Sequence, residues 1–261
     1  PPYHGVSTFT QELLAHGGAP NFSLQHLDTS DRRDTSNLGR WDATNLQLGF
    51  ASLSELAGSC LKSNTDIVYI PISQNVPAFL RDALYILQSR LLGKKVVVHL
   101  HGGYLRELFD QSGAPFQCFA RTALRAASGI IVLAEEFRPL FKDIVPDERV
   151  HVVENGVSDP GAWQLRGKRT SASPLRLIYM STLTRTKGIL ELLQALMILK
   201  SSHQKYELRV AGEWSDEALK AEALELVERH ALPVQFVGNV RGPEKARFLA
   251  EGDLFCLPTH Y

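Results

Sequence analysis

Residues 175–201 read LRLIYMSTLTRTKGILELLQALMILKS. The first six residues form a mainly apolar run, which predicts a buried strand. A short polar and basic turn follows, and from Gly188 onward the apolar side chains recur at helical spacing. This order of strand, turn and helix is the repeating unit of an α/β sheet.

The same alternation continues outward in both directions along the chain. Continuous apolar runs such as Val96–Val98 are typical of strands buried on both faces of a parallel sheet. The pattern therefore predicts a doubly wound α/β fold. The predicted strands are Ser23–Leu27, Asp66–Ile72, Lys95–Leu100, Gly129–Leu133, Val150–Glu154, Leu175–Met180, Glu207–Ala211, Val234–Val237 and Leu254–Pro258. The predicted helices are Val6–His16, Leu46–Ser63, Ala78–Leu92, Phe116–Ala127, Gly188–Ser201, Asp216–His230 and Gly242–Ala250.

One interruption predicts two Rossmann-like domains. Residues 166–174 are polar, basic and punctuated by glycine and proline, which is typical of a linker. We expect an N-terminal domain over residues 1–165 and a C-terminal domain over 175–261, with ligands bound at the carboxyl ends of the strands, in a cleft between the domains. The chain opens without methionine and closes after a strand-like run, so we expect the first strand to be missing and the second domain to be incomplete.

Composition narrows the class of protein. Lys plus Arg and Asp plus Glu number 28 each, so bulk charge does not favour a nucleic-acid partner. The apolar runs are too short to span a membrane. The three cysteines form no CxxC pair, and we interpret them as buried, reduced thiols of a cytoplasmic protein. The basic cluster Arg166–Arg169 leaves open a peripheral contact with the inner membrane face, against the alternative of a solvated linker.

Arg185 and Lys187 mark a candidate diphosphate site. Both lie just before a predicted helix, whose free N–H groups and dipole attract anions. Arginine can bind two phosphate oxygens at once, while lysine acts as a compact point charge. The alternative is a solvated basic loop.

His99 and His101 end another predicted strand and project from the same face. They could be two ligands of a metal ion or a structural pair. Alternatively, His101 alone could lie in the cleft and bind a substrate hydroxyl or phosphate. Gly5 and Asn155 lie in two further turns, and the sequence contains neither a GxGxxG nor a P-loop motif.

Taken in order, these segments resemble glycosyltransferase family 4, over nearly the whole chain. The glycine turn, the His-Gly strand end, the Asn-Gly-Val turn, the Lys-Gly loop, two later strand ends and the final strand each have a counterpart in that family. The segments that carry the resemblance are Pro2–Ser7, His99–Gly102, Val153–Val157, Leu183–Gly188, Val210–Glu213, Phe236–Val240 and Ala250–Thr259.

The resemblance implies a GT-B fold and retaining transfer of a sugar from a nucleotide-diphosphate sugar to an acceptor hydroxyl. No metal and no cofactor would be needed, the acceptor would be a glycan or a lipid-linked glycan, and the pathway would be polysaccharide biosynthesis. It assigns His101 as the catalytic residue. The donor-binding residues that it implies are Gly5, Asn155, Arg185, Lys187, Gly212, Glu213 and Val240.

Two departures limit this expectation. Thr182 occupies a position where many members of the family have arginine. The family's paired glutamates would begin after Tyr261, so the chain as written is expected to be inactive. The alternatives are a nucleotide-sugar hydrolase or epimerase on the same fold, a non-catalytic sugar- or nucleotide-binding module, and a metal-dependent hydrolase.

Overall fold

The structure is a computed structural model that describes residues 5–16, 22–29, 43–62, 65–156, 173–200 and 205–260. It divides into two compact units, Pro1–Val157 and Ser158–Tyr261. The predicted linker lies outside the described residues, except for its last two positions, as does the basic cluster Arg166–Arg169.

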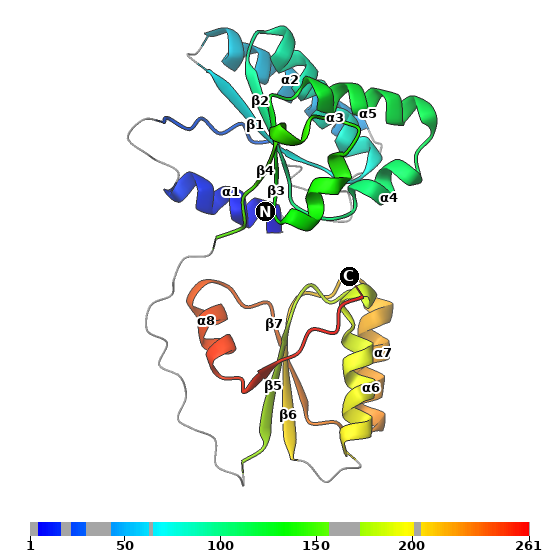
Figure 1. Ribbon diagram of the computed structural model, residues 1–261. Helices are drawn as coiled ribbons and strands as arrows, with labels where there is room; N and C mark the ends of the chain where they lie inside the picture. Colours follow the sequence, from blue (N-terminus) through cyan, green and yellow to red (C-terminus); the bar gives the residue numbers. More distant parts are fainter. Residues whose placement is uncertain are drawn as a thin grey trace. The chain divides into compact units, whose positions relative to one another are not determined.

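The first unit is built on a parallel four-stranded sheet in the order β1-β2-β3-β4 (Figure 1). Helix α3 packs against β1 and β2 and also contacts α2 and α5. The strands are β1 (Ile67–Ile72), β2 (Lys95–Leu100), β3 (Gly129–Val132) and β4 (Val150–Val152). The helices are α1 (Gly5–His16), α2 (Ala43–Lys62), α3 (Val76–Leu91), α4 (Leu105–Asp110) and α5 (Ala114–Ala126), with 3-10 turns η2 (Glu135–Phe141) and η3 (Asp147–Arg149).

The second unit contains another parallel sheet, in the order β7-β6-β5-β8. Helices α6 and α7 lie on one side of this sheet and α8 lies on the other (Figure 1). The strands are β5 (Leu175–Met180), β6 (Tyr206–Ala211), β7 (Val234–Gly238) and β8 (Leu254–Phe255). The helices are α6 (Ile189–Lys200), α7 (Glu217–Arg229) and α8 (Gly242–Ala250), and a 3-10 turn, η4 (Arg185–Lys187), precedes α6.

Strand β5 shows why its sequence is apolar. Tyr179 packs into the cluster formed with α6 and α7, whereas its neighbour Ile178 packs with Phe248 of α8 on the opposite face. Successive side chains of a strand point to opposite faces, so the part of a central strand that helices cover on both sides is apolar on both faces. The helices begin where the sequence caps them: the Asp216 carboxylate accepts hydrogen bonds from two backbone N–H groups in the first turn of α7.

All predicted helices and all but one of the predicted strands are confirmed, with ends that differ by a few residues. The strand predicted at Ser23–Leu27 is wrong, because residues 22–29 form no strand and pair with none of the described strands. Phe22 and Leu24 are exposed there. An apolar run becomes a strand only where its backbone groups find partners. Helix α4 and turn η2 were not predicted because they are too short to show a clear period.

The cysteines are not uniformly buried. Cys60 is buried and Cys256 is partly buried, but Cys118 is exposed. Cys118 lies one turn from Thr122 on the outer face of α5, while Ala120 and Leu124 form the buried face of that helix. The prediction that all three thiols are buried is therefore wrong for Cys118. None of the described helices combines the length and the apolar character needed to cross a membrane.

Gly212 closes the end of β6 against the end of β5. Its φ is +150°, and a Cβ atom at this position would overlap the backbone carbonyl of Ser181. The Gly212 N–H donates to the carbonyl of Gly238 on β7. A side chain would therefore force the ends of neighbouring strands apart.

We expect Gly212→Ala to destabilise the second unit by at least about 2 kcal/mol, because the change adds both backbone strain and steric overlap. Gly58→Ala is the matched control, since a Cβ at this position within α2 would meet open space. It should raise stability by about 0.5–1 kcal/mol. Hydrogen exchange of peptides from β5 and β6 measures the effect of Gly212→Ala, and exchange of peptides from α2 measures that of Gly58→Ala. Equal protection in wild type and Gly212→Ala would contradict the expectation.

Candidate functional site

The loop after β5 is fixed by hydrogen bonds to the continuation of β6. Ser181 N–H donates to the carbonyl of Ala211, and Leu183 N–H donates to the carbonyl of Glu213. The Leu183 carbonyl in turn accepts a bond from the Ser215 hydroxyl, at 2.9 Å. Leu183 is also buried in the core of the unit. The backbone that leads into η4 is therefore held by hydrogen bonds to β6 and its continuation, and by the packing of Leu183 in the core.

Gly188 makes the turn from η4 into α6. Its φ is +73°, in the left-handed region, and a Cβ atom here would overlap the carbonyl oxygen of Pro258. The Tyr179 hydroxyl, which rises from β5, donates to the carbonyl of Lys187 at 3.1 Å. Only glycine satisfies both the backbone angle and the close approach of the segment after β8.

The segment after β8 also contacts η4 and α6. The backbone N–H of His260 and the hydroxyl of Thr259 both donate to the carbonyl of Thr186, at 3.0 and 3.3 Å. The His260 ring lies 3.0 Å from a carboxylate oxygen of Glu191 in the first turn of α6. Contacts from β5, β6 and the segment after β8 therefore converge on η4, whose position is fixed from three directions.

The two cations of η4 differ in their surroundings. Arg185 forms an ion pair with Glu222 of α7, at 2.6 Å, and this hydrogen-bonded pairing raises the pKa of the guanidinium. Both side chains are about half exposed. Lys187 is partly buried, and its ammonium group has no hydrogen-bond or ion-pair partner among the described residues. Lys187 is therefore the cation of this loop that is available to an anion, whereas Arg185 must first leave Glu222.

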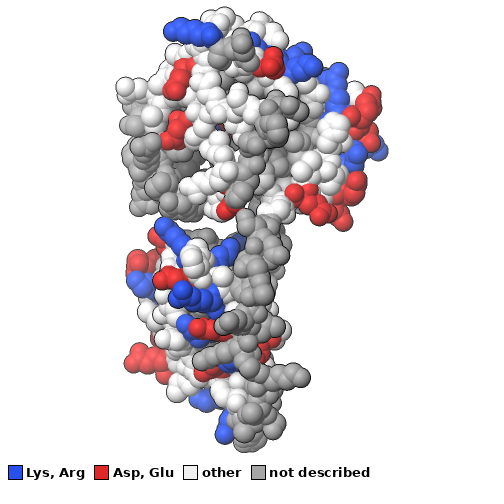
Figure 2. All heavy atoms as spheres, turned by 90° about the vertical axis from the view of Figure 1, so that its left-hand side faces the viewer, with Lys and Arg blue, Asp and Glu red and all other residues white. Residues whose placement is uncertain are grey.

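The surface charge of the second unit is mixed rather than basic. On the face shown in Figure 2, basic and acidic side chains alternate over the described part of this unit. An anion would therefore be attracted by the local arrangement at η4 and α6 rather than by a broad positive field.

In the first unit, Phe9, Tyr69, His99 and His101 form one cluster, here called the histidine cluster. The two imidazole rings lie against each other, with their centroids 3.8 Å apart and their planes tilted by 32°, and Phe9 of α1 packs against both. The Tyr69 hydroxyl, from β1, lies 2.5 Å from Nδ1 of His99 and 3.5 Å from Nε2 of His101. The two histidines lie at the carboxyl end of β2, where a ligand of this fold binds, and Tyr69 reaches them from the middle of β1.

The histidine cluster favours uncharged groups. Burial lowers the pKa of His99 to about 4, with a further lowering from the neighbouring His101. Burial also lowers the pKa of His101 and raises the pKa of the Tyr69 phenol. The imidazoles are therefore neutral near pH 7, and each can donate from one nitrogen and accept at the other.

The remaining predicted residues lie at ends of secondary structure in one unit or the other. Gly5 starts α1 and Asn155 follows β4, and both are exposed. In the second unit, Glu213 is exposed, and its carbonyl is bonded to the loop before η4. Val240, beyond the end of β7, is partly buried in the cluster around Phe248. Among the described residues, no group of three or more His, Cys, Asp or Glu side chains could hold a metal ion.

Sequence reasoning missed Tyr69 and Glu222. Tyr69 is the one hydroxyl-bearing residue in the otherwise apolar β1, and this was the available signal. In the sheet register Tyr69 pairs with Val97 and Pro71 with His99, so a tyrosine of β1 reaches the end of β2. Glu222 lies on the exposed face of α7 among other acidic residues, and nothing in its local sequence distinguishes it.

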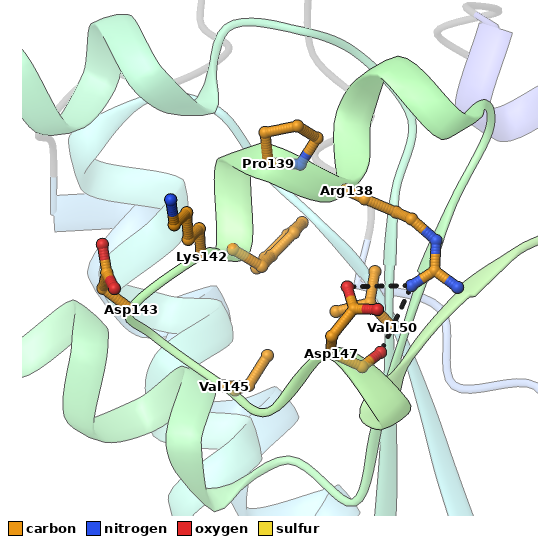
Figure 3. Close-up of a pocket in the computed structure, with 8 residues that line it drawn as sticks. Arg138, Pro139, Lys142, Asp143, Val145, Asp147 and Val150 are labelled. Atoms are coloured by element: carbon orange, nitrogen blue, oxygen red, sulfur yellow. Dashed lines mark hydrogen bonds and ion pairs between the residues drawn. The ribbon is translucent and has the colours of Figure 1, made fainter.

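Two surface hollows lie away from these residues. Figure 3 shows one of about 300 Å³ that is floored by Val145 and Val150 and edged by Arg138, whose guanidinium bonds to Asp147. Val150 begins β4, so this hollow lies at the amino end of that strand. A second, of about 290 Å³, lies at the start of β7. Neither contains a residue of η4 or of the histidine cluster, and both are at the edge opposite to that where ligands of this fold bind.

The fold is shared with solved glycosyltransferase structures. The Anabaena protein Alr3699/HepE, solved in complex with UDP, is similar with a TM-score of 0.62 and 16% identity, over 81% of this chain and 57% of that one. A glycosyltransferase from Rickettsia africae also gives a TM-score of 0.62, with 19% identity, over 84% of this chain and 58% of that one. The predicted fold class, α/β with Rossmann-like parallel sheets, is confirmed.

Sequence comparison is more specific for the C-terminal unit. Residues 163–261, which include η4 and Gly188, match the family described as Glycosyl transferases group 1. A GDP-mannose:cellobiosyl-diphosphopolyprenol alpha-mannosyltransferase of Xanthomonas campestris is 28% identical over 128 residues, 48% of this chain and 33% of that protein. A glycogen synthase of Mycobacterium tuberculosis is 29% identical over 114 residues, 43% of this chain and 27% of that protein. The matched segments thus span a third or less of these curated relatives.

We expect the low pKa of His99 to make stability depend on pH. The unfolded chain takes up a proton near the ordinary value of 6.5, whereas the folded chain does so only near 4. Stability is therefore full above about pH 7 and falls as the pH drops toward 5, by on the order of 1–2 kcal/mol after allowance for solvent screening. Urea denaturation at pH 7 and pH 5 measures the difference.

The variant His99→Asn cannot titrate and should reduce this loss, while His151→Asn, at an exposed position on β4, should keep the wild-type dependence. The same pH dependence in His99→Asn and wild type would show that His99 is not the source.

Proposed function

We propose that the protein containing this chain is a retaining, metal-independent glycosyltransferase. It would transfer a sugar from a nucleotide-diphosphate donor to an acceptor hydroxyl, with no cofactor. The observation that carries the proposal is the position of Lys187, a cation on a fixed turn at the start of α6 that has no ion-pair partner among the described residues. The match of residues 163–261 to the group 1 glycosyl transferases supports it, since that segment contains this turn.

The chemistry follows from where charge develops. When the bond between the sugar and the diphosphate breaks, negative charge accumulates on the leaving phosphate oxygens. Lys187 and the free N–H groups of the first turn of α6 would stabilise that charge without a metal ion. Because η4 is fixed by β5, β6 and the segment after β8, these groups need little rearrangement when the charge forms. Gly212 and Glu213, at the end of β6, and Val240, beyond β7, would lie beside the nucleoside.

In the first unit, His101 would contact the donor sugar. A neutral imidazole suits this role, because it can donate a hydrogen bond to a sugar oxygen while its other nitrogen is held by the protein. Gly5, at the start of α1, and Asn155, after the end of β4, would also approach the donor.

The acceptor belongs to the same proposal. The curated relatives are named for a polyprenol-linked saccharide acceptor in one case and for glycogen synthesis in the other. A glycan or lipid-linked glycan acceptor, in polysaccharide biosynthesis, agrees with both names. We place the protein in the cytoplasm, with peripheral contact at the inner face of the membrane when the acceptor is lipid-linked.

Lys187→Ala should weaken binding of a nucleoside diphosphate to the chain by roughly 10- to 100-fold, since hydrogen bonds to charged groups contribute about 1.5–3 kcal/mol. Isothermal titration with UDP, GDP and ADP measures the change. Lys205→Ala removes the same charge at the amino end of β6, the opposite edge of the sheet, and should leave binding unchanged. Equal affinities for wild type and Lys187→Ala would rule out the assigned phosphate site.

Glu222→Gln should strengthen diphosphate binding by roughly two- to fivefold. It releases Arg185 from an exposed and therefore weak ion pair, so that the guanidinium can turn to the phosphate. Glu225→Gln on the same helix, which breaks an ion pair with Arg229, is the matched control and should have no effect. In the background of Arg185→Ala the gain should disappear. A weaker affinity in Glu222→Gln would instead mean that Glu222 orients Arg185 toward the ligand.

A further inference from the structure

The histidine cluster contains one buried nitrogen without a partner. His99 is 2% exposed, and its Nε2 makes no hydrogen bond within the described part of the chain. Its Nδ1 faces the Tyr69 hydroxyl at 2.5 Å. Buried polar atoms are almost always paired, and an unpaired buried N–H is rarer than an unpaired acceptor. The proton of a neutral His99 is therefore better placed on Nδ1, where it has a partner, than on Nε2.

This placement decides the direction of the neighbouring bonds. If His99 donates from Nδ1, the Tyr69 oxygen is the acceptor, and the phenolic proton is free to point elsewhere. Among the described residues, Nε2 of His101 is an acceptor within reach, at 3.5 Å from the same oxygen. The opposite order, in which Tyr69 donates to His99, would leave an N–H donor at the buried Nε2 without an acceptor, which is the costlier arrangement.

We propose that His99 and Tyr69 are positioning residues that hold His101 in a single tautomer, through the ordered bonds His99 Nδ1–H to Tyr69 Oη and Tyr69 Oη–H to His101 Nε2. His101 then carries its proton on Nδ1. That N–H is the donor offered to a ligand, and it suits an oxygen acceptor such as a sugar hydroxyl. The last step rests on the function proposed above, whereas the tautomer itself does not.

Packing supports the same arrangement. The Phe9 ring contacts both imidazoles, with ring centroids 5.3 Å from His99 and 4.6 Å from His101, and the two imidazoles lie against each other. The rings therefore have little freedom to rotate, and His101 cannot exchange its two nitrogens by turning over. The tautomer of a histidine is set by the hydrogen bond that its other nitrogen makes, and here that bond comes from Tyr69.

The test is nitrogen-15 NMR of the chain labelled at histidine, at pH 7.5 and without any ligand. The signals of His101 are identified by their loss in His101→Gln. In the wild type, Nδ1 of His101 should be protonated and Nε2 unprotonated. In Tyr69→Phe the single tautomer should give way to a mixture, because Nε2 has lost its donor. Tyr85→Phe, which removes another buried hydroxyl of this unit that bonds to Ser52, should leave His101 unchanged.

Substitution of His99 gives an independent check if Tyr69→Phe fails to fold. His99→Asn retains a side-chain N–H donor and should preserve the wild-type tautomer of His101, whereas His99→Leu has no donor and should not. A protonated Nε2 on His101 in the wild type, or the same His101 signals in wild type and Tyr69→Phe, would overturn the proposal. Because no nucleotide or sugar is present, these outcomes are independent of whether the protein is a glycosyltransferase.

Discussion

The parallel pairing of strands is the constraint on which the candidate site depends. Every strand pair in the described residues is parallel, so within each sheet all strands end at the same edge. The connections that leave this edge lie outside the packed layers of sheet and helices. They can therefore carry polar side chains. This geometry brings Tyr69 next to His99 in one sheet and places the η4 turn beside the end of β6 in the other.

Close backbone packing then makes one of these turns rigid. The left-handed Gly188 lets the segment after β8 approach α6, and that segment contributes two donors to the carbonyl of Thr186. The backbone carbonyls of Thr186 and Lys187 accept hydrogen bonds from within the protein. The Lys187 side chain is therefore the group of this turn that can bind a ligand. The difference between Lys187 and Arg185 is therefore a difference in partners rather than in charge.

The sequence alone predicts those candidate site residues that lie together within one short segment of the chain. The strand, basic turn and helix around Lys187, and the paired histidines at the end of β2, could be predicted because each lies within a single short segment. Tyr69 and Glu222 could not, since they reach their partners from other elements through sheet register and helix packing. The strand predicted at Ser23–Leu27 failed for a related reason: apolar character shows that a segment can be buried, but not that it has a partner strand.

The most direct test of the account is a crystal structure of the chain with a nucleotide-diphosphate sugar. We predict that the diphosphate lies at the start of α6, with a phosphate oxygen within hydrogen-bonding distance of the Lys187 ammonium group. A diphosphate bound at the amino edge of either sheet, in the hollow beside Val150 or in the one at the start of β7, would contradict it.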